Sequence, residues 1–152
     1  MHEPAPLHPR PDFTGVWQAK FEESNLLGPP PREILTRIEH REPHIDQQIL
    51  LTQASGNEQR LAFHFATTGE ETTNSVGGGI GRTHARWDGT ELVIESWLET
   101  PDRKLHFKDH WSLSADGQTL TMARRDDDLA GQIVVNKKAP LRAALKFDTK
   151  DR

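Results

Sequence analysis

The chain contains no cysteine. Disulfide bonds and thiolate chemistry are therefore excluded, and redox usage gives no guide to the compartment. No stretch approaches the ~18 consecutive apolar residues of a membrane-spanning helix, so we expect no membrane span. The first residues, Met1-His2-Glu3-Pro4-Ala5-Pro6, hold no apolar signal core. We expect a cytoplasmic protein if this N-terminus is native, and a secreted or periplasmic one if a signal peptide has been removed.

The chain also lacks a strong excess of either charge. Its net charge is −4 over 152 residues, with both signs interspersed, so no nucleic-acid surface is expected. Apolar residues make up only 34%, but four Trp and six Phe can supply the core of one domain. The strong catalytic motifs, such as Gly-x-Ser-x-Gly and His-Glu-x-x-His, are absent from the sequence. We predict neither a cofactor nor a metal.

The residues that are present alternate as in short strands separated by turns. The first predicted strand covers residues 13–21, and others lie near 33–41, 44–53, 59–67, 80–87, 91–98, 104–113, 118–125 and 131–137. Eight or nine strands in series favour an all-β, single antiparallel up-and-down β-barrel, because closure removes exposed edges. A β-sandwich is the alternative. Residues 140–146 predict a short C-terminal helix. We divide the chain into a disordered arm (1–12), a barrel domain (13–147) and a tail (148–152).

The dipeptide Asp88-Gly89 sets a register for the later strands, because it is a strong two-residue hairpin signal. Taken as the turn, it places Ala85 opposite Leu92 and Thr83 opposite Ile94. Alternation makes this the buried face. The following strands fold back with Leu98 opposite Leu105, and with Leu113 opposite Leu120. Their inner face then carries Leu105, Phe107, Asp109, Trp111 and Leu113, with Leu120, Met122 and Arg124 beside them.

One polar residue interrupts each of these apolar series, and the two interruptions, Asp109 and Arg124, face each other. A lone buried carboxylate is costly, and a guanidinium is its usual remedy. The sequence therefore predicts a buried Asp109–Arg124 pair. One interpretation is an internal ion pair that fixes register or closes one barrel end. The other is an anchor for an anionic or polar ligand group. A register error at the turn between 113 and 120 would separate the two residues.

Other inward positions extend this candidate site. A barrel of about eight strands can hold one small ligand, and we predict that Phe63, Phe65, Thr83, Ser96, Phe107, Trp111 and Met122 contact it. His40 shares a face with Ile38 and is either an acid or base near neutral pH or an ordinary core histidine. His106 and His110 are four residues apart on one strand, which separates them by ~13 Å, too far to share one metal ion. We expect both to face solvent.

A first-strand motif carries a family resemblance. Phe13-Thr14-Gly15-Val16-Trp17 resembles the Gly-x-Trp motif of lipocalins and related calycin barrels. This likeness implies that Trp17 closes one barrel end and packs against a basic residue from a late strand, for which Arg124 and Arg125 are the candidates. Segments 38–43, 85–96 and 111–121 look like a group of small bacterial lipocalin-like proteins. The likeness covers roughly residues 13–137 and implies a lipocalin-like barrel.

The predicted function is binding of a small hydrophobic or amphiphilic molecule in the barrel. The alternative is a cofactor-independent enzyme in the same cavity: a hydrolase, lyase, isomerase or cyclase. In that case His40 or Asp109 would be the acid or base, and Arg124 would anchor an anion. A third interpretation, a structural or interaction module, requires a filled interior. The expected partner is a small molecule, and the oligomeric state is open, with a homodimer among the options.

Overall fold

The computed structural model describes residues 10–76, 78–126 and 129–147, so most of the predicted arm and all of the predicted tail lie outside the described residues. The described residues form ten strands, a 3₁₀ turn (Phe21–Glu23), and a short helix α1 (Leu141–Ala144) that continues into a second 3₁₀ turn (Leu145–Phe147). The strands are β1 (Gly15–Ala19), β2 (Glu33–Arg41), β3 (His44–Thr52), β4 (Glu58–Ala66), β5 (Thr72–Val76), β6 (Gly79–Asp88), β7 (Glu91–Glu99), β8 (Lys104–Leu113), β9 (Thr119–Asp126) and β10 (Leu129–Lys138).

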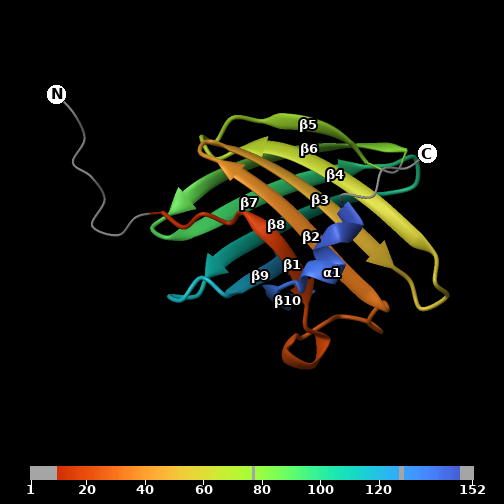
Figure 1. Cartoon of the computed structure of the whole chain (residues 1–152). Coiled ribbons are helices and arrows are strands. Elements are labelled where there is room, and N and C mark those ends of the chain that lie inside the picture. The colour runs from red at the N-terminus through yellow and green to blue at the C-terminus, as the bar shows by residue number, and fades with distance from the viewer. Residues whose placement is uncertain (1–9, 77, 127–128, 148–152) are drawn as a thin grey trace.

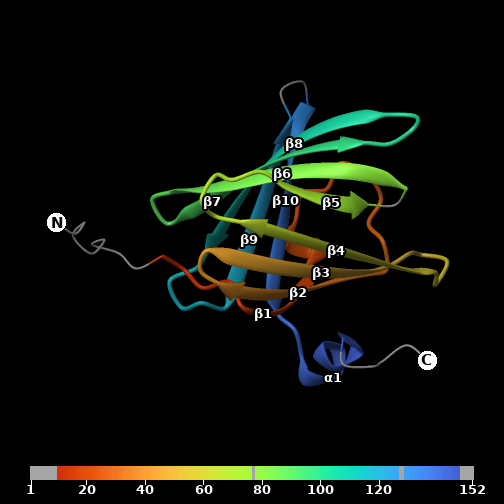
Figure 2. The ribbon, with the colours of Figure 1, turned by 90° about the horizontal axis from the view of Figure 1, so that it is seen from above.

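The strands form one antiparallel sheet with the order β4-β3-β2-β1-β10-β9-β8-β7-β6-β5. Neighbours in sequence are neighbours in space, except that β1 also pairs with β10 (Figure 1). The sheet curls until its two end strands, β4 and β5, lie beside each other (Figure 2). The predicted antiparallel up-and-down barrel is confirmed, although the described strands number ten instead of eight or nine. The prediction omitted β5, whose sequence Thr-Thr-Asn-Ser-Val shows no apolar alternation.

A side chain connects the two end strands of the sheet. The His64 N–H donates to Asn74 Oδ1 (2.9 Å), and Asn74 Nδ2 donates to the His64 carbonyl (3.0 Å). An amide side chain offers the same donor and acceptor as a peptide group. Asn74 on β5 therefore stands in for a neighbouring strand and completes the hydrogen bonding of β4 at His64.

We expect Asn74→Ala to destabilise the fold by about 1–2 kcal/mol, because two hydrogen bonds are lost at a partly solvated edge. Urea unfolding followed by Trp fluorescence measures the change. The matched control is Thr73→Ala, an exposed residue on the same strand, which is expected to change stability by less than about 0.5 kcal/mol. Equal effects of the two substitutions would show that the Asn74 bonds do not hold β4 to β5.

The β6–β7 register differs from the prediction by two positions. Asp88 pairs with Glu91, so the turn residues are Gly89 and Thr90, and Ala85 faces Ile94 instead of Leu92. Gly89 has φ +64°, as a type II′ turn needs at its first central residue. The predicted turn would have required a positive φ at Asp88. A shift of two keeps every side chain on its predicted face, so the inner and outer sets are unchanged.

The predicted registers of the next strands are confirmed. Leu98 faces Leu105 across β7 and β8, and Leu113 faces Leu120 across β8 and β9. Asp109 is consequently placed directly opposite Arg124.

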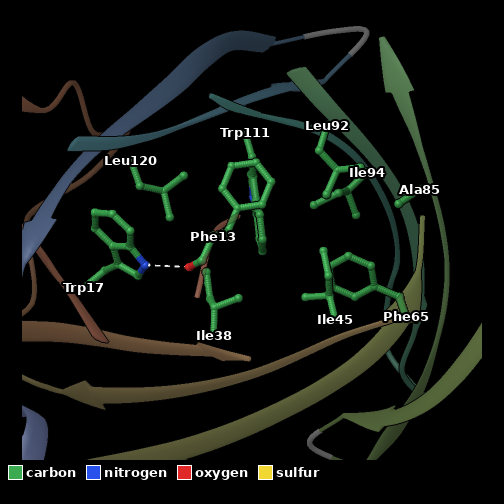
Figure 3. Close-up of a cluster of buried hydrophobic side chains, with 10 residues drawn as sticks. All are labelled: Phe13, Trp17, Ile38, Ile45, Phe65, Ala85, Leu92, Ile94, Trp111 and Leu120. Atoms are coloured by element: carbon green, nitrogen blue, oxygen red, sulfur yellow. Dashed lines mark hydrogen bonds between the residues drawn. The ribbon is translucent and has the colours of Figure 1, made fainter. Parts of the chain in front are cut away.

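The main core fills one end of the barrel, which we call the closed end. Its ten buried side chains point toward one another from strands on all sides (Figure 3); they are Phe13, Trp17, Ile38, Ile45, Phe65, Ala85, Leu92, Ile94, Trp111 and Leu120. Trp17 is fully buried, and its indole N–H donates to the Phe13 carbonyl at 3.0 Å. The last residues before β1 thus form part of the plug at this end.

The basic partner of Trp17 is Lys138, whose Nζ lies 4.3 Å from the centre of the indole ring. The prediction of Arg124 for this role was wrong, and the side chain of Arg125 lies outside the described part of the chain. The reason is topological: β10 pairs with β1 and brings Lys138 opposite Trp17, whereas Arg124 lies on the next strand over.

A smaller apolar cluster covers the outside of the barrel. Leu35 and Leu50 point outward from β2 and β3 and are buried under Ala143 of α1, with Ala139 and Phe147 packed alongside. The helix lies over β2 in Figure 1. This confirms the predicted short C-terminal helix and explains two outward-facing leucines in otherwise polar positions.

Candidate functional site

Inward-facing side chains are buried at the closed end but partly exposed at the opposite end. His40, Ile45 and Leu92 lie at the closed end and are buried. Further along the same strands, inward-facing apolar residues keep part of their surface in solvent. We call this region the open half; its inward-facing residues include Ile49, Leu61, Thr83, Ser96, Leu98, Leu105, Phe107, Asp109 and Arg124, of which Thr83 is buried. Solvent therefore reaches the inner face of the barrel from this side.

The Asp109–Arg124 pair lies in the open half and forms a bidentate ion pair. Arg124 Nε donates to Asp109 Oδ1 at 2.8 Å, and Nη2 donates to Oδ2 at 3.1 Å. The predicted pairing is confirmed, but its predicted burial is wrong for the arginine. The Asp109 side chain is 17% exposed and that of Arg124 is 44% exposed. The pair meets solvent because it lies on the half of β8 and β9 that extends beyond the packed core.

Arg124 is held from a second direction as well. Its guanidinium carbon lies 4.3 Å from the centre of the Phe107 ring, a cation–π geometry. Partial burial lowers the pKa of Arg124, but the hydrogen bond and charge of Asp109 outweigh it and raise the pKa above its usual value. The arginine therefore stays charged at any pH at which the protein is folded.

His40 lies at the closed end, and both of its ring nitrogens are engaged. The Phe13 N–H donates to Nδ1 at 3.2 Å, so the ring proton is on Nε2, which donates to Glu42 Oε1 at 2.9 Å. The ring stacks against both Phe13 and Trp87, with centroid distances of 5.6 and 6.0 Å. No contact among the described residues joins His40 to the Asp109–Arg124 pair, so the structure does not bring the three predicted catalytic residues together.

Glu42 is a hydrogen-bonding centre that the sequence analysis missed. Besides His40, its carboxylate accepts from the Thr67 hydroxyl (3.0 Å) and from the Trp87 indole N–H (2.8 Å). Burial raises the pKa of Glu42, but the hydrogen bonds from His40, Trp87 and Thr67 outweigh it and hold the pKa below its usual value. The only local signal was the Glu42-Pro43 turn next to His40, because Trp87 comes from β6 and Thr67 from the turn after β4.

The predicted ligand-contact residues fall into two groups. Phe65 and Trp111 belong to the packed core and meet edge-on at 5.9 Å, and Phe63 and Met122 pack against that core from partly exposed positions. Thr83, Ser96 and Phe107 line the open half, where the Thr83 and Ser96 hydroxyls are hydrogen-bonded at 3.2 Å. The role of these seven residues in binding stays a prediction.

The outer face of the barrel carries the conspicuous histidines. His106 Nε2 lies 2.6 Å from Glu95, and His110 Nδ1 lies 2.8 Å from Glu91. Within the described ranges, no group of three or more His, Asp or Glu side chains has a geometry that could hold a metal ion.

Two hollows of about 300 and 380 Å³ border the outer face of β2, β3 and β4, and the first also reaches Gln47, Phe63 and Asn74. Both are lined by charged side chains that include Glu39, Asp46 and His64. Of the predicted ligand-contact residues, only Phe63 lines a hollow, and it lines the first of the two. Neither hollow is lined by a residue assigned above to the open half of the barrel.

Comparison with known proteins identifies the architecture. No protein-family model and no curated protein matches the sequence. A solved abundant heat-soluble (SAHS) protein from Ramazzottius varieornatus matches with a TM-score of 0.65 and 16% identity, over 89% of this chain and 100% of that one. The fluorescent protein UnaG matches with a TM-score of 0.57 and 13% identity, over 84% and 97%. The fatty acid transporter REP1-NXSQ matches with a TM-score of 0.56 and 10% identity, over 84% and 96%.

At these identities the similarity shows the fold alone. The chain has a lipocalin-like, calycin-type β-barrel fold, as the Gly-x-Trp motif predicted. In the described part of the chain, no helix is both long enough and apolar enough to cross a membrane.

Proposed function

We propose that the open half of the barrel binds a small hydrophobic or amphiphilic molecule. One observation carries this proposal: Leu98, Leu105 and Phe107 face inward yet stay partly exposed, although the opposite end is closed by a packed core. Apolar walls with a few polar anchors are the usual anatomy of a ligand site. Asp109 and Arg124 are the polar anchors here.

The structural neighbours support a ligand-binding role in general terms, since one of them is described as a fatty acid transporter. The enzymatic alternative has no supporting observation, because His40 is engaged at the closed end by Phe13 and Glu42. We therefore propose binding without turnover.

The test is to fill the open half. Ser96 faces inward between Thr83 and Phe107, so a larger side chain there occupies the space proposed for the ligand. We expect Ser96→Phe to weaken binding of the neutral dye Nile red by roughly tenfold or more, with the far-UV circular dichroism spectrum unchanged. Dye fluorescence titrations measure the affinity.

Thr73→Phe is the matched control, because it adds the same ring to an exposed, outward-facing position on β5. It is expected to leave dye affinity unchanged. A wild-type protein that does not bind the dye, or a Ser96→Phe variant that binds it as tightly as wild type, would refute a binding site in the open half.

A further inference from the structure

We infer that the barrel selects an uncharged amphiphile, such as a long-chain alcohol, amide or ester, over a fatty-acid-type anion. This inference rests on the proposed function and specifies the ligand class of the same site. The structural basis is the internal ion pair: among the inward-facing side chains that the structure describes in the open half, the cation is Arg124, and it already has Asp109 bound to it.

Strand alternation defines which side chains contribute charge to the interior. Among the inward-facing positions whose side chains are described, charged residues of the open half are limited to Asp109 and Arg124. Lys138 also lies on an inward-facing position, but at the closed end over the Trp17 ring. Every other described inward position of the open half is apolar or a neutral polar residue. Over these described inward positions, the charges of Asp109 and Arg124 cancel at neutral pH.

The geometry of the pair determines what Arg124 can still offer. Nε and Nη2 each donate to a different oxygen of Asp109, at 2.8 and 3.1 Å, so two of the five guanidinium N–H groups are used. The remaining N–H groups are able to donate to a hydroxyl, amide or ester oxygen without disturbing the pair. A neutral headgroup with an acceptor oxygen thus gains a charge-assisted hydrogen bond.

A carboxylate headgroup meets a different balance. Its attraction to Arg124 is weakened by repulsion from Asp109, because the Asp109 carboxylate is in direct contact with the guanidinium. The cost of removing the carboxylate from water is not offset. A cationic headgroup is in the same position with the signs exchanged. The intact pair therefore disfavours both ions relative to the neutral molecule.

The experiment compares three probes with one chain and three headgroups: oleyl alcohol, oleate and oleylamine. Each displaces Nile red from the delipidated protein at about pH 8, where oleate is anionic and oleylamine is cationic. We expect wild type to bind oleyl alcohol roughly tenfold or more tightly than either ion. Asp109→Asn leaves the Arg124 charge without a counter-ion and is expected to reverse the preference in favour of oleate. Arg124→Gln leaves Asp109 without its cation and is expected to favour oleylamine.

Matched controls change the same charges on the opposite face of the same sheet. Glu95→Gln on β7 and Lys108→Gln on β8 face outward and oppose each other in register, and both are expected to keep the wild-type order of the probes. Wild type binding oleate as tightly as oleyl alcohol would overturn the inference while leaving the proposed function intact. Unchanged preference in both Asp109→Asn and Arg124→Gln would overturn it as well. Failure of wild type to bind Nile red or any of the three probes while folded would instead refute the proposed function.

Discussion

Phe13→Ala is expected to destabilise the protein by about 3–5 kcal/mol, the range for removing a fully buried aromatic side chain. Phe13 is 0% exposed and precedes the first strand. Its ring stacks on His40 and Trp87 and meets Trp111 edge-on at 5.5 Å. Its removal leaves a cavity at the centre of the closed end, where the rigid strands around it limit collapse. Urea unfolding at neutral pH measures the loss.

Leu27→Ala is the control, because Leu27 is 58% exposed and its truncation is expected to cost less than about 0.5 kcal/mol. A loss below about 1 kcal/mol for Phe13→Ala would mean that residue 13 is not part of the core. The closed end would then be formed by the strands alone.

Glu42→Ala is expected to cost about 1–3 kcal/mol at pH 7, because the buried His40 N–H, the Trp87 indole and the Thr67 hydroxyl lose their acceptor. The carboxylate is 41% exposed, so water replaces part of what is lost and the value falls toward the lower end of the range. Urea unfolding measures it against Glu22→Ala, an exposed carboxylate on the 3₁₀ turn after β1.

The same substitution is expected to reduce the sensitivity of the fold to acid. The folded-state pKa of Glu42 lies below its usual value of 4.5, so the unfolded chain takes up the proton first as the pH falls. The stabilising effect of the ionised carboxylate is complete above 4.5 and is lost as the pH falls through the lower folded pKa. Stability measured from about pH 7 to 3 should fall more steeply in wild type than in Glu42→Ala. Parallel curves of stability against pH for the two proteins would contradict a lowered pKa of Glu42 in the folded state.

Much of the barrel was predictable because period-two alternation is a local property. The β7–β8 and β8–β9 registers followed from it, and with them the opposition of Asp109 and Arg124. Alternation distinguishes two registers that differ by one residue, but not two that differ by two residues. The predicted β6–β7 register was wrong by two residues. It also gave no signal for β5, whose polar residues are placed by pairing with β6.

Properties of the site depended on contacts between distant segments. The exposure of Arg124 depends on how far the core extends along β8 and β9. Glu42 gains its partners from β6 and from the segment after β4, and Lys138 reaches Trp17 only because the last strand pairs with the first. None of these contacts has a local sequence signature.

The amino-acid sequence therefore determined the class of fold, the inner and outer faces of the predicted strands, and the facing of Asp109 and Arg124. These features depend on turns and alternation between strands that are adjacent in the chain. The tertiary structure alone decided which end of the barrel is packed, which groups engage His40, and that the ion pair lies at the edge of solvent. Closure of the sheet is responsible, because it brings β1 against β10 and β4 beside β5, and so sets where the interior is filled and where it stays open.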